Sequence, residues 1–114
     1  MTTNYLAGSP SQTQAAGIVN FASGLAKTDS GAASVSTFTP GFSPRYIRWV
    51  NVTDSIMHEW YEGMSATAQT VKTVLNGTRS LETTDVIANP GDGTFTVTAV
   101  IIVASKTHVW QAFG

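Results

Sequence analysis

Turn-forming residues recur along the chain at intervals of roughly eight to twelve residues and divide it into short segments. Dense groups of Gly, Pro, Asn, Asp and Ser lie at 28–31, 40–44, 76–77 and 89–93. These residues adopt the backbone angles of turns, and Pro also removes a backbone donor, so a long helix cannot pass through them. No window between them shows the repeat of about 3.6 residues that marks an amphipathic helix. The spacing therefore predicts an all-β chain.

Residues 45–52 form the clearest of the predicted strands. They are rich in aromatic and β-branched side chains, which favour strands. Ile47 and Trp49 share one face by alternation, whereas Tyr46 and Val50 share the other. Because both faces carry bulk, we expect this strand to be covered on both sides.

Further strands are predicted between the other turns. Ser23-Gly24 is expected to end the first of them, and Asn76-Gly77 predicts a type I′ hairpin turn. The segment 94–103 reads as a long central strand, and its part within 99–104 is apolar on both faces. The predicted segments are 17–22, 34–38, 56–61, 70–75, 78–83, 94–103 and 106–111, with a short apolar piece at 86–88.

The length of 114 residues fits one domain with its own core. We expect an antiparallel β-sandwich or jelly-roll-like domain over residues 17–114, with roughly seven or eight strands. Residues 1–16 are mostly small or polar and are interpreted as an extended N-terminal arm or tail. The chain has no cysteine, which excludes disulfides and thiolate metal sites.

Charge is sparse and balanced along the chain. Charged residues make up 11% of it, where about 25% is usual. The six Lys and Arg residues are scattered, so the positive stripe of a nucleic-acid binder is not expected. The weak net charge of -1 and the lack of a long apolar run argue against a membrane partner. Ser and Thr replace much of the missing charge, which favours a surface that is buried in a permanent assembly.

Few residues form a pattern that suggests chemistry. His58-Glu59 begins like a metalloprotease motif, but Glu62 occupies the position that a second His requires, so no metal site is predicted. The other histidine, His108, could meet His58 in space as a catalytic pair. Glu59 and Glu62 should lie on opposite faces of one strand and should not converge as paired acids. We therefore predict no enzyme, no catalytic residues and no cofactor.

Three tryptophans allow two interpretations. Trp49, Trp60 and Trp110 could form a platform on which sugar rings stack, which would make the chain a carbohydrate-binding module. Packing in a core or an interface is the favoured interpretation, because buried aromatic side chains dominate both settings.

Four blocks of sequence carry a family resemblance, in preserved order: 38–51 (FTPGFSPRYIRWVN), 59–64 (EWYEGM), 75–79 (LNGTR) and 104–107 (ASKT). In these blocks the chain resembles small virion structural proteins of tailed bacteriophages, most closely the capsid cement (decoration) proteins. The resemblance implies a β-rich homotrimer that is assembled in the host cytoplasm. It would bind the major capsid protein on the outer surface of the capsid and clamp neighbouring shell subunits. Tail, fibre-base and head-fibre roles stay open, as does a carbohydrate-binding module on a tail or head appendage.

The apolar and aromatic content exceeds what one small core requires, so part of it is expected to meet another protein. The predicted interface residues are Tyr5, Leu6, Val100, Ile102, Trp110 and Phe113.

Overall fold

The computed structural model describes residues 20–31, 34–67 and 69–114. These residues contain strands and no helix, which confirms the predicted all-β class. The strands are β1 (Phe21–Lys27), β2 (Ser36–Phe38), β3 (Tyr46–Asn51), β4 (Ile56–Tyr61), β5 (Thr70–Thr73), β6 (Arg79–Glu82), β7 (Ile87–Ala88), β8 (Phe95–Val97) and β9 (Thr107–Phe113). The arm predicted for residues 1–16 lies outside the described residues.

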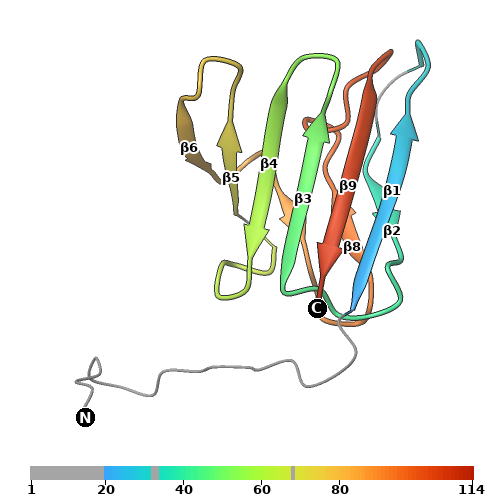
Figure 1. Cartoon of the computed structure of the whole chain (residues 1–114), viewed down its shortest axis with the longest axis vertical. Helices are drawn as coiled ribbons and strands as arrows, with labels where there is room; N and C mark the ends of the chain where they lie inside the picture. The colour runs from blue at the N-terminus through green and yellow to red at the C-terminus, as the bar shows by residue number, and fades with distance from the viewer. Residues whose placement is uncertain (1–19, 32–33, 68) are drawn as a thin grey trace.

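The strands form two sheets that pack face to face as a β-sandwich (Figure 1). The larger sheet has six strands in the order β1-β9-β3-β4-β5-β6, and the smaller has three in the order β2-β8-β7. Every pairing in both sheets is antiparallel. The smaller sheet lies behind the larger one in Figure 1, so it covers only one of the two faces of the larger sheet.

The core lies between the two sheets and follows from strict alternation along β3 and β9. Ile47 and Trp49 of β3 point inward, as do Trp110 and Ala112 of β9. The ring of Phe38 in β2 closes the core from the other side. Its centroid lies 5.2 Å from that of Trp49 and 5.9 Å from that of Trp110. The buried apolar cluster is Ile47, Trp49, Trp60, Ile87, Phe95, Val97, Ile101, Ile102, Trp110 and Ala112.

The first strand continues through Gly24 instead of ending there. Gly24 pairs with Trp110 in the register of β1 and β9, and a Cβ at this position would collide with the indole ring. The glycine is therefore in the strand because only a residue without a side chain leaves room for the tryptophan. The prediction that Ser23-Gly24 ends a strand was wrong, since β1 runs to Lys27.

The strand predicted for 94–103 is also wrong beyond its first part. Strand β8 ends at Val97, and the carbonyl of Thr98 then accepts hydrogen bonds from the amides of Ile101 (3.0 Å) and Ile102 (3.2 Å). The turn made by these bonds lets two consecutive isoleucines enter the core, whereas a strand would send them to opposite faces.

The predicted hairpin at Asn76-Gly77 is present between β5 and β6, but its turn differs from the prediction. Gly77 has a φ of 86° and donates its amide to the carbonyl of Val74 at 2.8 Å, while Asn76 does not adopt a positive φ. The glycine therefore takes the left-handed position alone, as in hairpin loops of three residues.

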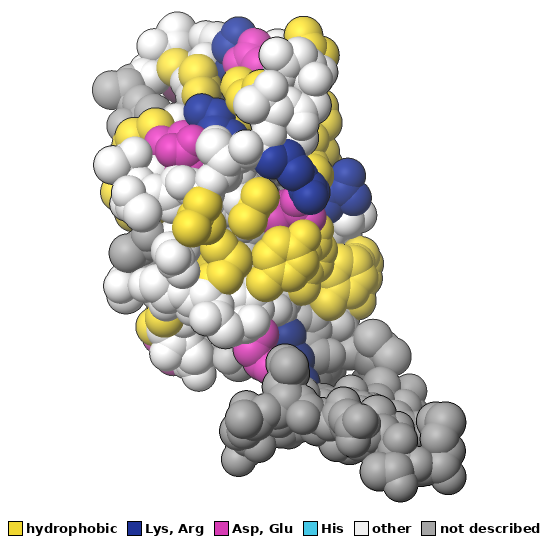
Figure 2. All heavy atoms as spheres, turned by 90° about the vertical axis from the view of Figure 1, so that its left-hand side faces the viewer, with side chains coloured by type: hydrophobic (Ala, Val, Ile, Leu, Met, Phe, Trp, Pro, Cys, Tyr) yellow, Lys and Arg dark blue, Asp and Glu magenta, His cyan; other side chains and the backbone are white. Residues whose placement is uncertain are grey.

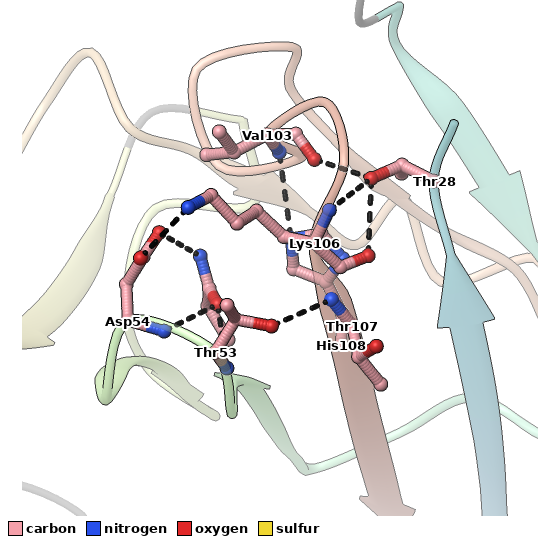
Figure 3. A network of polar contacts seen from close by, with 8 residues as sticks. Thr28, Thr53, Asp54, Val103, Lys106, Thr107 and His108 are labelled. Carbon is pink, nitrogen blue, oxygen red and sulfur yellow. Dashed lines mark hydrogen bonds and ion pairs between the residues drawn. The ribbon is translucent and has the colours of Figure 1, made fainter. Parts of the chain in front are cut away.

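A network of polar contacts fastens one end of the sandwich (Figure 3). Lys106 donates from its amide to Oγ1 of Thr28 at 2.9 Å and from Nζ to Oδ1 of Asp54 at 3.1 Å. The amide of Thr107 donates to Oγ1 of Thr53 at 3.0 Å. These bonds tie the segment before β9 to the end of β1 and to the turn between β3 and β4.

Candidate interaction surface

One face of the six-stranded sheet points away from the three-stranded sheet, and we call it the outer face. Leu25 and Leu81 on this face are 61% and 59% exposed, although each is a large aliphatic side chain. The strand register places the following residues on the outer face: Phe21, Ser23, Leu25, Lys27, Tyr46, Arg48, Val50, Met57, Glu59, Tyr61, Val71, Thr73, Arg79, Leu81, Thr107, Val109, Gln111 and Phe113. An exposed apolar face of this extent marks an interaction surface in a folded protein.

Four aromatic rings form a continuous row across one end of the outer face. Phe21, Phe113, Tyr46 and Tyr61 are consecutive partners in the register of β1, β9, β3 and β4. Their ring centroids are separated by 5.0, 5.8 and 5.1 Å in that order. We call these residues the aromatic row. Rings at this spacing attract one another and present a broad apolar surface with little freedom to rearrange.

A buried carboxylate holds one end of the aromatic row in place. The side chain of Glu59 is 7% exposed, and its Oε2 accepts hydrogen bonds from the hydroxyls of Tyr46 (2.5 Å) and Tyr61 (3.0 Å). Its Oε1 pairs with Nη2 of Arg79 at 3.2 Å. Burial and the bond to Glu59 raise the pKa of Tyr46, and the bond to Glu59 together with burial raises the pKa of Tyr61. Both hydroxyls therefore stay protonated as donors, which fixes the two rings.

A groove runs beside the aromatic row over β1, β9 and β3. It has a volume of about 630 Å³, and its apolar walls come from Leu25, Val50, Val52, Val109 and Trp110. Arg48 is one of three polar side chains that line the same groove, and Gln111 and Ser23 are the others. The groove is thus mainly aliphatic with a few polar groups, which is the usual composition of a binding surface.

Seen from the side of β6, the molecule presents hydrophobic side chains gathered beside Lys and Arg side chains, with acidic side chains among them (Figure 2). Aromatic and arginine side chains next to one another are characteristic of the centres of protein interfaces.

The predicted interface residues lie in different environments, some of them on the surface and others in the core. Phe113 belongs to the aromatic row, and Val100 is exposed in the segment between β8 and β9. Ile102 and Trp110 are only 5% and 8% exposed and belong to the core cluster. The bulk of Ile102 fills the core of this chain, so its place in the predicted interface was wrong, whereas Trp110 packs in the core and also lines the groove of the outer face.

The other two predicted interface residues, Tyr5 and Leu6, lie outside the described residues. Sequence reasoning missed most of the outer face, including Phe21, Tyr46 and Tyr61. The signal that could have found it was the alternation in 45–52 and 56–61, which gave two apolar faces, only one of which the smaller sheet covers.

The tryptophan platform suggested for sugar binding does not exist in this fold. Trp49, Trp60 and Trp110 are all buried, and Nε1 of Trp60 donates to the carbonyl of Ser65 at 2.9 Å. The tryptophans are core residues, as the favoured interpretation of the sequence expected.

The two histidines are held by different partners. Nε2 of His58 lies 3.4 Å from Oδ2 of Asp85, and the same oxygen accepts from Nζ of Lys72 at 3.3 Å. Nδ1 of His108 lies 3.2 Å from the carbonyl of Ala26, while its Nε2 accepts from the amide of Val103 at 3.4 Å. Burial lowers the pKa of both rings, so both are neutral around pH 7. Each ring is a hydrogen-bonding part of the core.

The acidic pair considered from the sequence does not converge. Glu59 is enclosed on the outer face, whereas Glu62 is exposed and forms an ion pair with Nε of Arg45 at 3.5 Å. Within the part of the chain that the structure describes, no group of three or more His, Asp and Glu side chains could hold a metal ion. The same part contains no helix that is long and apolar enough to cross a membrane.

No protein-family model, curated protein or solved structure matches this chain significantly.

Proposed function

We propose that this chain is a structural protein of a bacteriophage virion that binds the outer surface of the capsid and stabilises it. In this role it acts as a cement protein, clamps neighbouring subunits of the major capsid protein and works as a homotrimer. The observation that carries the proposal is the outer face, where an aromatic row and an aliphatic groove lie open to solvent.

The size of the outer face suits stable adhesion. Six strands at a spacing of about 4.8 Å give a sheet roughly 25 Å wide. The area of such a face, which is its width multiplied by the length of a strand, is of the same order as the roughly 800 Å² that each partner contributes to a standard interface. Apolar contact stabilises by about 25 cal/mol for each Å² removed from water, and repeated sites on a shell add their contributions.

The family resemblance supports the same surface. Its blocks 38–51 and 59–64 contain Tyr46, Arg48, Glu59 and Tyr61, which lie on the outer face. The same blocks also contain core residues, among them Ile47, Trp49 and Trp60, so the resemblance covers both faces of β3 and β4.

Head-binding measurements test the proposal. Phage heads that lack this protein are mixed with the purified chain, and bound protein is measured by sedimentation with the heads. Wild type is expected to sediment alone as a trimer and to bind the heads. Tyr61→Ser is expected to bind at least about tenfold more weakly while keeping its far-ultraviolet circular dichroism, because it removes an aromatic anchor.

Leu75→Ser is the matched control, because Leu75 is 78% exposed but lies at the tip of the β5–β6 hairpin. It is expected to bind the heads as wild type does. Failure of the wild-type protein to bind heads would overturn the proposal. Selective binding to a glycan array that is lost in Tyr61→Ser would instead support the alternative of a carbohydrate-binding module that uses the aromatic row.

A further inference from the structure

The outer face differs in charge from the rest of the molecule. Three cationic side chains, Lys27, Arg48 and Arg79, lie on it together with one carboxylate, Glu59. The other three cationic side chains and the other six carboxylates lie elsewhere in the molecule, and one of these carboxylates, Asp85, is buried. The chain as a whole has a net charge of -1, so its charges are segregated, with the positive excess on the apolar face.

Arg48 stands at the centre of this excess. Its cross-strand neighbours are Glu59 and Gln111, but the carboxylate of Glu59 is already bound by two tyrosine hydroxyls and by Arg79. The Nε of Arg48 donates to Sδ of Met57 at 3.2 Å, and no ion pair involves Arg48 among the described residues. Arg48 lines the groove beside the aromatic row.

A partner that covers the outer face must therefore compensate this charge. Burying a guanidinium without an anion costs free energy, whereas a carboxylate placed against it can form two parallel hydrogen bonds. A second copy of the chain cannot supply that carboxylate from the same face. A two-fold axis would set the positive excess of one copy against that of the other, and like charges oppose association.

From this arrangement we infer that the outer face binds an apolar protein surface that carries carboxylates, with Arg48 as the group that selects for acid. The inference rests on the proposed function in taking the outer face as the binding surface. It goes further by defining the chemistry of the partner. On a phage shell, the surface that receives this face is expected to combine exposed aliphatic or aromatic residues with Asp or Glu.

Two synthetic peptides test the charge preference without any phage component. Both contain the same Leu and Phe residues, and one alternates them with Glu and the other with Lys. Each is titrated into isotopically labelled protein at low salt, and the amide shifts of the outer face are followed by NMR. The Glu peptide is expected to bind at least about fivefold more tightly, an advantage that 0.5 M salt removes, because such attraction is screened.

Arg48→Glu is expected to reverse the preference, and Arg48→Lys is expected to keep most of it. Leu75→Ser is the matched control and should leave both affinities unchanged. Equal or tighter binding of the Lys peptide, shifts confined to other surfaces, or no binding of either peptide would overturn the inference.

Sedimentation of the outer-face variants distinguishes a second copy from a different partner. Tyr61→Ser and Arg48→Glu are expected to keep the oligomeric state of wild type, because a different protein occupies the face. A loss of oligomers in either folded variant would show that a second copy binds there and would overturn the inference. If the acid preference holds but wild type does not bind heads, the proposed function fails and the inference stands.

Discussion

The indole of Trp110 occupies the space that a side chain on Gly24, its cross-strand partner, would fill. This contact lets β1 pair along its whole length with β9 and keeps a large ring inside the sandwich. A change at the glycine therefore acts on the packing of the core and not on the flexibility of a loop.

Gly24→Ala is expected to lower the free energy of unfolding by about 1–3 kcal/mol, because its methyl group forces the indole or the strand to move. Urea denaturation followed by tryptophan fluorescence measures the change. Ser23→Ala, on the exposed face of the same strand, is the control and should stay within about 0.5 kcal/mol of wild type. An alanine at position 24 that leaves the unfolding midpoint unchanged would contradict this account of the packing.

Asp85→Ala is expected to lower the free energy of unfolding by about 2–4 kcal/mol. It removes the carboxylate that binds both His58 and Lys72, and it leaves the polar groups of a buried site without a partner. The exposed carboxylate of Glu62 provides the comparison, since Glu62→Gln breaks only its surface pair with Arg45 and should cost less than about 1 kcal/mol. Similar losses in the two variants would show that the buried cluster is not a stabilising contact.

Stability is expected to fall as the pH drops below the ordinary histidine pKa of 6.5. Burial lowers the pKa of His58 and of His108 in the folded protein, so the unfolded chain takes up protons first and is favoured. For His108 the reason is also geometric, because its Nε2 accepts a hydrogen bond and cannot do so once protonated. The measurement is the urea midpoint at pH 7.5 and at pH 5.5. A midpoint that stays constant or rises at the lower pH contradicts the assignment.

The tyrosines of the outer face should resist ionisation. In wild type, Tyr46 is expected to remain protonated well above its ordinary pKa of 10.0, since burial and the bond to Glu59 raise that pKa. Because the folded state holds this proton more tightly, stability is present below pH 10 and is lost as the pH rises further. Spectrophotometric titration near 295 nm follows the phenolates. Glu59→Gln should shift the Tyr46 transition to lower pH, and an unchanged titration curve would mean that the carboxylate does not hold the ring.

Much of the fold could be predicted from local patterns. Strands 45–52 and 56–61 were placed correctly because alternation and β-branched or aromatic residues agree there. The sequence predicts the hairpin at Asn76-Gly77 because both residues tolerate a positive φ, although only Gly77 adopts one. These features depend on a few neighbouring residues, so a single sequence contains the information for them.

The errors lie where distant residues decide the local structure. The local sequence predicts a strand end at Gly24 because the tryptophan that requires this glycine is far away in the sequence. The local pattern predicts that Ile101 and Ile102 belong to a strand, because it does not show that a turn can bury both side chains. The sequence shows that the strands of the outer face carry apolar residues on both sides. It does not show that the second sheet is too small to cover both sides, because alternation does not reveal how many strands each sheet contains.

The position of β9 has a consequence for how the molecule forms. It lies between β1 and β3, so two strands from the first half of the chain stay apart until a segment from the second half inserts between them. Such long-range pairing slows folding, because chain entropy is lost before the contacts form. A nascent chain or a fragment without β9 therefore carries β1 without a partner strand and β3 with one open edge, and chaperones or proteases would act on that form first.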